Sequence, residues 1–183
     1  MRLVAKKRLA AFQLDVDVEV SNKILVIGPN GSGKSTLLKC VAGLWRCGAG
    51  GRWLYVPPEP QAPKRMKVRD YIKLLEDALR VKVRTDLFGV DYLERKMGEL
   101  SSGMAKRVML AVAFSTDMPL ALDEPTAFLD AAWRRRLLEL VDSREPVIVA
   151  THDAELIEAL SRWDLLELAG GRPIKVRRSH VGS

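Results

Sequence analysis

Long apolar runs and cysteines are both scarce in this chain of 183 residues. Its longest uncharged apolar run, residues 108–116, has about half of the roughly 20 residues that a membrane-spanning helix needs. The two cysteines, Cys40 and Cys47, are too few for a disulfide framework or a cluster of metal ligands, and we expect a reducing, cytoplasmic environment. The basic segment 1–12 lacks an apolar core and a cleavage site, which predicts no signal peptide.

The charge balance is positive, with 30 Lys and Arg against 23 Asp and Glu and a net charge of +7. Such a charge permits nucleic acid, an anionic membrane surface or a phosphate ligand as a partner, and it selects none of them. We interpret most of the basic runs as solvated faces. The hydrophobic share of 48% is that of an ordinary globular chain with one domain, or with one domain and a small subdomain.

Two kinds of apolar pattern predict the strands of a mostly parallel sheet. Segment 12–20 alternates apolar and polar residues, which indicates one wet face, whereas 24–27 is continuously apolar and indicates burial on both faces. Strands and helices then alternate along the chain, as in an α/β fold with helices on both sides of the sheet. We predict strands at 12–20, 23–27, 53–56, 119–122, 147–150, 165–168 and 174–176, and helices at 34–44, 68–79, around 92–97, from Ser101 or Ser102 to 114, at 131–141 and at 154–160.

The piece between Gln61 and Arg107 is predicted to be helical and to contain no strand. It therefore has the pattern of a small subdomain inserted into the sheet domain. We expect one domain, in which residues 1–60 and 108–183 form the core and residues 61–107 form the helical subdomain.

A glycine-rich loop lies between the predicted strand 23–27 and the helix that begins at 34. Its sequence fits the pattern G-x-x-x-x-G-K-[ST] as Gly28-Pro29-Asn30-Gly31-Ser32-Gly33-Lys34-Ser35. Backbone N–H groups of such a loop, with the helix N-terminus behind them, surround phosphate oxygens. We predict that Lys34 reaches the β- and γ-phosphates of a nucleotide and that the Ser35 hydroxyl is a ligand of Mg²⁺. The alternative is a glycine-rich turn with a surface lysine, and the flanking strand and helix favour nucleotide binding.

Two carboxylates follow the buried strand 119–122. Asp123 is predicted to hold the Mg²⁺ shell, and Glu124 is predicted to face the γ-phosphate and polarise the attacking water. A strand that happens to end in acidic residues is the alternative. The phosphate loop favours the functional interpretation, because P-loop enzymes need a carboxylate of this kind on a neighbouring strand.

With these residues, the chain resembles the nucleotide-binding subunit of ABC-type ATPases over nearly its whole length. The resemblance rests on five segments in that family's order. Gly28 to Thr36 is similar to the Walker A motif, Leu100-Ser101-Ser102-Gly103-Met104 to the signature LSGGQ, Asp123-Glu124-Pro125-Thr126 to the end of Walker B, Ala127-Phe128-Leu129-Asp130 to the D-loop, and Thr151-His152-Asp153 to the segment with the switch histidine.

The resemblance implies a P-loop NTPase fold, with a β-rich N-terminal edge beside the sheet and a short helical subdomain that ends in the signature. It also implies a dimer that encloses two ATP with Mg²⁺, each ATP between Walker A of one chain and the signature of the other. Implied nucleotide contacts are Gly28, Pro29, Asn30, Gly31, Ser32, Gly33, Lys34, Ser35, Thr36, Ser101, Gly103 and Asp130. The implied catalytic residues are Glu124, His152 and Lys34, and the implied metal ligands are Ser35 and Asp123.

His152 is implied to contact the γ-phosphate and to hold Glu124 and the water in place. A histidine that caps a strand end at the surface is the alternative interpretation. The preceding motifs favour the role in the site.

The chain departs from the family pattern at several positions. Pro58 stands where the family has a glutamine that helps to ligate Mg²⁺, and Glu59 or Gln61 is the candidate substitute. Ser102 and Met104 replace a glycine and the glutamine of the signature. The aromatic residue that stacks on adenine in the family has one candidate upstream of the phosphate loop, Phe12, which a strand pattern also explains.

Three functions follow from these residues. The first is an ATP-hydrolysing subunit that docks from the cytoplasm on a separate membrane permease. The second is a soluble ABC-type ATPase, for example in iron–sulfur cluster assembly; the DNA-repair type is excluded because residues 34 to 100 leave no room for a long coiled coil. The third is a weakly hydrolysing regulatory subunit, against which the intact catalytic residues argue. We expect no nucleic-acid partner, and specificity for a transported substrate would lie in the permease.

Overall fold

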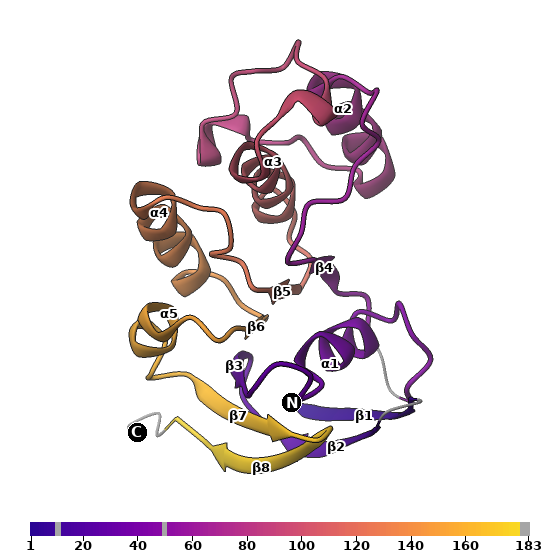
Figure 1. Cartoon of the computed structure of the whole chain (residues 1–183), viewed down its shortest axis with the longest axis vertical. Helices are drawn as coiled ribbons and strands as arrows, with labels where there is room; N and C mark the ends of the chain where they lie inside the picture. The colour runs from indigo at the N-terminus through magenta and orange to yellow at the C-terminus, as the bar shows by residue number, and fades with distance from the viewer. Residues whose placement is uncertain (10–11, 49–50, 180–183) are drawn as a thin grey trace. The chain divides into compact units, whose positions relative to one another are not determined.

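The computed structural model describes residues 1–9, 12–48 and 51–179, and its two compact units are drawn in Figure 1. The first, which we call the core unit, consists of Met1–Tyr55, Met118–Pro125 and Val141–Ser183. The second, the helical unit, consists of Val56–Asp117 and Thr126–Leu140. The helical unit is therefore larger than the insert expected at 61–107, because it takes in residues on both sides of that insert and a segment after 125.

A six-stranded sheet in the order β4-β5-β6-β3-β7-β8 forms the centre of the fold. β3 runs parallel to β6 and β7, β5 runs parallel to β6, and β8 closes the edge antiparallel to β7. The mostly parallel α/β fold is thus confirmed. The strands are β3 Lys23–Ile27, β4 Leu54–Val56, β5 Leu120–Asp123, β6 Val147–Ala150, β7 Asp164–Ala169 and β8 Arg172–Arg177.

The register of the parallel strands brings three loops, those after β3, β5 and β6, to one edge of this sheet, where these strands have their carboxyl ends. Ala150 of β6 pairs with Val26 of β3 on one side and with Asp123 of β5 on the other. The segments that follow these strands therefore leave from the same edge, which is where open α/β sheets bind their ligands. The buried strands β5 and β6 are wholly apolar up to that edge, except for Asp123.

The N-terminal edge is a separate antiparallel hairpin of β1 Arg2–Arg8 and β2 Gln13–Glu19, drawn in indigo in Figure 1. β1 was not predicted, because its basic residues conceal a weak alternation in which only Leu3 and Ala5 are buried. Cross-strand ion pairs account for the charge: Arg2 lies 2.8 Å from Asp17, and Lys6 lies 3.6 Å from Asp15.

Two helices belong wholly to the core unit. α1 Lys34–Val41 follows the phosphate loop, and α5 Ala154–Ala159 begins at Asp153, whose carboxylate accepts bonds from the N–H groups of Glu155 and Leu156. α1 ends three residues before the predicted limit of 44, and Gly43 then turns the chain with a left-handed φ of 74°.

The same turn explains an unexpected disulfide. The structure joins Cys40, in the last turn of α1, to Cys47, with the two Cα atoms 5.4 Å apart and both residues buried. The two cysteines were expected to be too few for a disulfide framework, and they form this single disulfide. The number of cysteines could not reveal it, because the reversal after α1 brings the two together. The compartment inferred from cysteine usage loses its basis in consequence.

The helical unit contains α2 Val68–Leu79, α3 Ser102–Phe114 and most of α4 Ala131–Asp142, with 3₁₀ turns η1 Thr85–Phe88 and η2 Met97–Glu99. The prediction of a helix around 92–97 is wrong. The carbonyls of Leu93 and Arg95 accept from the N–H groups of Arg69 and Val68 at the start of α2, so they are not available for a local helix. None of the helices in the described ranges has the length and apolarity needed to cross a membrane.

Candidate functional site

The glycine-rich loop after β3 has the backbone that its sequence predicts. Gly28 has a φ of 148°, and a Cβ at this position would lie 2.3 Å from the carbonyl oxygen of Leu168, so a side chain cannot be accommodated. Gly33, with a φ of 105°, precedes α1 and provides no side-chain cap. The first N–H groups of α1 are therefore not bonded by a capping side chain, and a helix N-terminus of this kind attracts anions.

Lys34, the first residue of α1, is buried rather than on the surface. Only 8% of the residue is exposed, and its Nζ donates to the carbonyl oxygens of Gly28 and Pro29 at 2.7 and 3.2 Å. The ammonium is thus held by the loop that is predicted to surround phosphate. The alternative of a surface lysine does not describe this position.

A cavity of about 180 Å³ opens beside the loop and is lined by residues 30–36 and by Phe12. The alternation of 12–20 predicts Phe12 inside a strand, but Phe12 lies one residue before β2. Its ring is half-buried against the loop, since an added Cβ on Gly33 would lie 3.2 Å from its Cε2 atom. The aromatic ring and the phosphate loop therefore belong to one site.

Asp123 ends β5 with 1% of its surface exposed. Its Oδ2 accepts a hydrogen bond of 2.8 Å from the hydroxyl of Tyr55, whereas Oδ1 is buried and has no hydrogen-bond partner among the described residues. Burial, followed by the negative charge of Asp123 and the hydrogen bond to it, raises the pKa of Tyr55 well above its usual value. The phenol therefore remains a donor to the carboxylate.

The orphaned oxygen of Asp123 fits a bound divalent cation. The described part of the chain has no cluster of three or more His, Cys, Asp or Glu side chains that could hold a metal alone. Mg²⁺ in phosphate-transfer sites does not require such a cluster, because it keeps several waters and uses one or two protein ligands with the phosphates. Asp123 and the hydroxyl of Ser35, in the first turn of α1, are therefore suitable ligands; α1 packs against β5 in the core unit.

A cluster at the same end of the sheet consists of Glu124, which follows β5, and of Thr151 and His152, which follow β6. Glu124 has a left-handed φ of 44°, and its N–H donates to Ala150. Its Oε2 accepts from the hydroxyl of Thr151 at 2.9 Å, and its Oε1 lies 2.6 Å from Nδ1 of His152. Only 17% of the Glu124 side chain is exposed, against 67% of the imidazole. A strained backbone in this position commonly marks a functional site.

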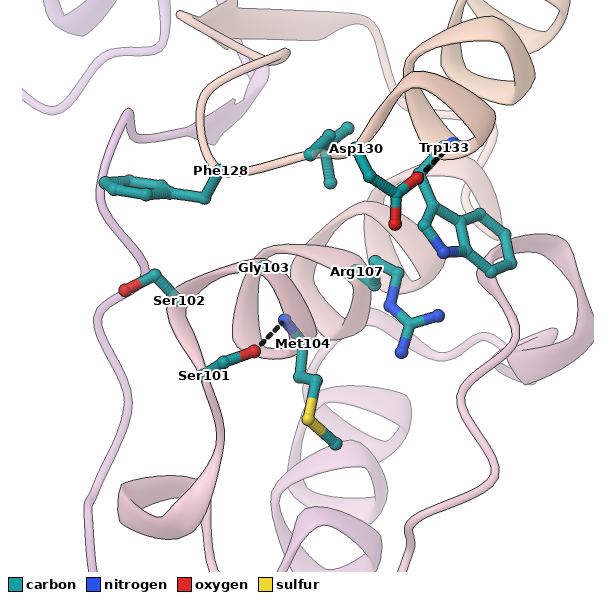
Figure 2. A pocket seen from close by; sticks show the side chains of 9 residues that line it. Ser101, Ser102, Gly103, Met104, Arg107, Phe128, Asp130 and Trp133 are labelled. Atoms are coloured by element: carbon teal, nitrogen blue, oxygen red, sulfur yellow. Dashed lines mark hydrogen bonds between the residues drawn. The ribbon is translucent and has the colours of Figure 1, made fainter.

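The signature segment lies in the helical unit, at the start of α3. The Oγ of Ser101 accepts from the N–H of Met104 at 3.2 Å and caps the helix. A cavity of about 460 Å³ is bordered here by 101–104, Arg107, 128–130 and Trp133 (Figure 2). Gly103 is needed for packing, because a Cβ would lie 2.5 Å from the carbonyl oxygen of Phe128. Ser102 is exposed, which explains why this position tolerates a side chain.

Asp130, at the other wall of that cavity, caps α4. Its Oδ1 accepts from the N–H of Trp133 at 3.0 Å (Figure 2). Arg107 lies between two aromatic rings, 5.3 Å from the centroid of Tyr92 and 4.7 Å from that of Trp133. These aromatic partners were not predicted, because they come from segments distant in sequence.

The loop after β4 is held by Lys106 of α3, a residue that the sequence analysis missed. Lys106 is fully buried, and its Nζ donates to the carbonyl oxygens of Pro57 and Pro58 at 2.8 and 3.0 Å. Glu59 and Gln61, the candidate substitutes for the family's glutamine, are both exposed. Lys106 stands within α3, and the sequence gives no signal that its side chain bonds to the loop after β4.

The predicted site residues thus form two groups. The core unit brings together the phosphate loop 28–36, Asp123, Glu124 and His152, and the helical unit brings together Ser101, Gly103 and Asp130. Each group lies within its own unit.

Comparison with known proteins agrees with this geometry. The family described as ABC transporter matches residues 12–127. The chain is 27% identical to the iron(3+)-hydroxamate import ATP-binding protein FhuC of Bacillus subtilis, over 92% of this chain and 76% of that protein. It is 33% identical to the zinc import ATP-binding protein ZnuC of Paramagnetospirillum magneticum, over 87% of this chain and 68% of that protein.

Solved structures share the fold. An ATP-binding subunit of an ABC transporter aligns with a TM-score of 0.81 and 20% identity, covering 96% of this chain and 88% of that one. A dimeric ATP-binding cassette bound to ADP and Pi aligns with a TM-score of 0.77 and 17% identity, covering 98% and 97%. The family match spans well over half of the sequence and carries the phosphate loop and the signature. The chain therefore belongs to the ABC transporter family, as one of its ATP-hydrolysing subunits.

Proposed function

We propose that this ATP-hydrolysing subunit closes with a second ABC subunit around two ATP molecules and thereby drives a separate membrane permease. The observation that carries the proposal is the Glu124 cluster, in which a largely buried carboxylate is fixed by Thr151 and His152. A general base must be held within hydrogen-bond reach of the water that it activates. The import roles in the names of the relatives support a transporter subunit over a soluble ATPase.

In this proposal, the phosphates of ATP lie in the loop 28–36 and accept from its backbone N–H groups. Lys34 exchanges its two carbonyl partners for phosphate oxygens, which are stronger acceptors because they are charged. The ring of Phe12 lines the same cavity and is our candidate for the platform that stacks on adenine.

Ser35 and Asp123 are the proposed ligands of Mg²⁺. When bound, the cation neutralises charge that develops on the transferring phosphoryl group. The buried Oδ1 of Asp123, which has no hydrogen-bond partner in the described part of the chain, supports this assignment, because a carboxylate oxygen without a partner is costly unless a ligand satisfies it.

Glu124 is proposed to accept the proton of the attacking water. Its two oxygens have different partners: Thr151 donates to Oε2, and Oε1 lies against the imidazole of His152. This arrangement fixes the carboxylate while the exposed imidazole remains accessible to the γ-phosphate. His152 thus both orients the base and supplies a polar contact for the phosphate.

The signature acts on the ATP of the second subunit. Ser101 and the N–H of Gly103 stand at the N-terminus of α3, where the helix dipole favours an anion. The partner is another copy of this chain or a related ABC subunit, and the permease is an integral-membrane protein on whose cytoplasmic face the subunit lies. The two named relatives import different cargoes, iron hydroxamate and zinc, so cargo selection belongs to the permease.

Glu124→Gln tests the function. Glutamine keeps the shape but cannot take the proton, so hydrolysis should fall by about 10²- to 10⁴-fold. ATP binding should persist, and the uncleaved ATP should hold two chains together by mass action. Light scattering after a sizing column should show a dimer with ATP and Mg²⁺ and a monomer with ADP.

The matched control is Glu158→Gln, which changes an exposed glutamate on α5. It should hydrolyse ATP as the unaltered chain does. Normal hydrolysis by Glu124→Gln would remove Glu124 as the base, and an inactive variant that stays monomeric with ATP would contradict the role of the signature.

A further inference from the structure

The hydroxyl of Tyr55 is the donor to Asp123 within the described part of the chain. Tyr55 lies on β4, which is the neighbour of β5 in the sheet, and its side chain reaches the carboxylate at the end of that strand. The O–H···O distance of 2.8 Å is that of a well-formed hydrogen bond. Among residues 1–9, 12–48 and 51–179, Oδ1 is buried without a hydrogen-bond partner, so that Oδ2 alone is engaged.

From this asymmetry we infer that Tyr55 is a positioning residue, whose hydroxyl holds Oδ2 of Asp123 so that Oδ1 is the oxygen left for the divalent cation of ATP. The inference rests on the proposed function. It adds a residue that none of the recognised motifs contains. Tyr55 acts through Asp123 and is not itself a ligand in this proposal.

The physical reason lies in the burial of the carboxylate. Asp123 is 1% exposed, so water cannot replace a missing donor, and a buried carboxylate without hydrogen bonds is strongly disfavoured in its charged form. A carboxylate with two free oxygens can also rotate about its χ2 torsion, which is broad for such groups. One fixed donor removes that freedom, and groups that orient metal ligands commonly change metal affinity by about 10- to 100-fold.

The alternative is that the hydrogen bond only satisfies a half-buried phenol. The two interpretations differ in how the loss of the hydroxyl changes the dependence of nucleotide binding on Mg²⁺. A positioning role changes the Mg²⁺ requirement of nucleotide binding. A purely structural role changes the stability of the chain, or its affinity for nucleotide with and without Mg²⁺ by the same factor.

Tyr55→Phe is the test, because it deletes the hydroxyl and keeps the ring in the sheet. Binding of a non-hydrolysable ATP analogue is measured by calorimetry in a series of Mg²⁺ concentrations and again in EDTA. We expect the Mg²⁺ concentration at half-maximal enhancement of binding to rise about 10-fold, while affinity in EDTA changes less than about twofold. Mn²⁺ in place of Mg²⁺, followed by electron paramagnetic resonance, gives a direct readout of the cation.

Tyr71→Phe is the matched control. Tyr71 is also partly buried, and its hydroxyl donates to the carbonyl oxygen of Gln61 at a long 3.5 Å in the helical unit. Its loss should leave the Mg²⁺ series unchanged. A double-mutant cycle with Asp123→Asn then asks whether Tyr55 acts through the carboxylate, because the tyrosine change should add nothing once the carboxylate is gone.

The outcomes separate this inference from the proposed function. An unaltered chain that neither binds the analogue nor responds to Mg²⁺ overturns the proposed function and the inference with it. A responsive unaltered chain with an unchanged Mg²⁺ series in Tyr55→Phe overturns the inference alone. An equal loss of affinity with and without Mg²⁺, or a tyrosine effect that persists in Asp123→Asn, also overturns it.

Discussion

The proposed site residues of the core unit (28–36, Asp123, Glu124 and His152) form what we call the catalytic edge. This edge and the signature cavity of the helical unit are held in different ways. At the catalytic edge, Lys34 and Asp123 are almost entirely buried, and each is fixed by short hydrogen bonds within its own unit. At the signature, Ser101 and Ser102 are exposed, and Phe128 has 51% of its surface in solvent. The first region is preorganised within one chain, whereas the second presents capping groups and an aromatic ring that a second chain can cover.

This difference predicts where substitutions act. Changes at the catalytic edge should remove binding or chemistry in an isolated subunit. Changes at the signature should leave the first binding step intact and affect pairing of two subunits, because electrostatic groups at a helix N-terminus act over about one turn.

Lys34→Ala should give the largest effect. It removes a buried ammonium that is hydrogen-bonded at the phosphate loop, and such losses cost about 2 to 5 kcal/mol, or roughly 30- to 4,000-fold in affinity. Calorimetry with ATP and Mg²⁺ measures it. Lys39→Ala is the control on the same helix, since the Lys39 ammonium lies 5.2 Å over Trp45 instead. ATP affinity equal to that of the unaltered chain would show that the buried ammonium of Lys34 does not hold the phosphates.

Gly103→Ala should give an intermediate effect in the helical unit. The new methyl group would lie 2.5 Å from the carbonyl oxygen of Phe128, so the backbone around it must shift. Overpacking of this kind costs about 1 to 3 kcal/mol of unfolding free energy, which urea denaturation would register. Monomeric ATP binding should be retained, and ATP-dependent dimerisation should weaken.

Ser102→Ala provides the neighbouring control, because Ser102 is exposed and its change should stay within about 0.5 kcal/mol. If both variants were equally stable and dimerised equally well, the packing argument for Gly103 would fail.

Pro58→Gln should have the smallest effect. The backbone carbonyl that accepts from Lys106 is retained, and glutamine restores the side chain that the family has at this position. We expect unchanged ATP affinity and a turnover that is equal or higher, measured by phosphate release. A large loss of turnover would mean that the exposed Glu59 or Gln61 already supplies the ligand.

Sequence patterns predicted those elements whose burial is regular. The helix 68–79 was placed correctly, because its apolar residues recur at helical spacing on one face. The sequence does not predict β1, because its basic residues obscure the alternation of its two buried residues. It wrongly predicts a helix around 92–97, because backbone hydrogen bonds to the start of α2 replace local ones there. Tertiary context overrode local preference at 92–97.

The residues of the candidate site also fall into those that the sequence predicts and those that it does not. Lys34, Asp123 and Glu124 could be found because their motifs fix residue type and spacing over a strand, a loop and a helix. The contacts of Tyr55 and Lys106 could not be found from the sequence, because their hydrogen-bond partners lie 68 and about 50 positions away in the chain. Their roles depend on which strands become neighbours and on how the loop after β4 folds onto α3.

Because Lys106 is buried, the rate at which its amine is chemically labelled reports opening of the helical unit. The side chain is 0% exposed and bonded to two proline carbonyls, so reagents that modify lysine amines cannot reach it while the helical unit is folded. Lysines at the surface react at once, whereas this amine reacts only when α3 separates from Pro57 and Pro58 in the loop after β4. Its labelling rate, followed by mass spectrometry, therefore reports how often the helical unit opens.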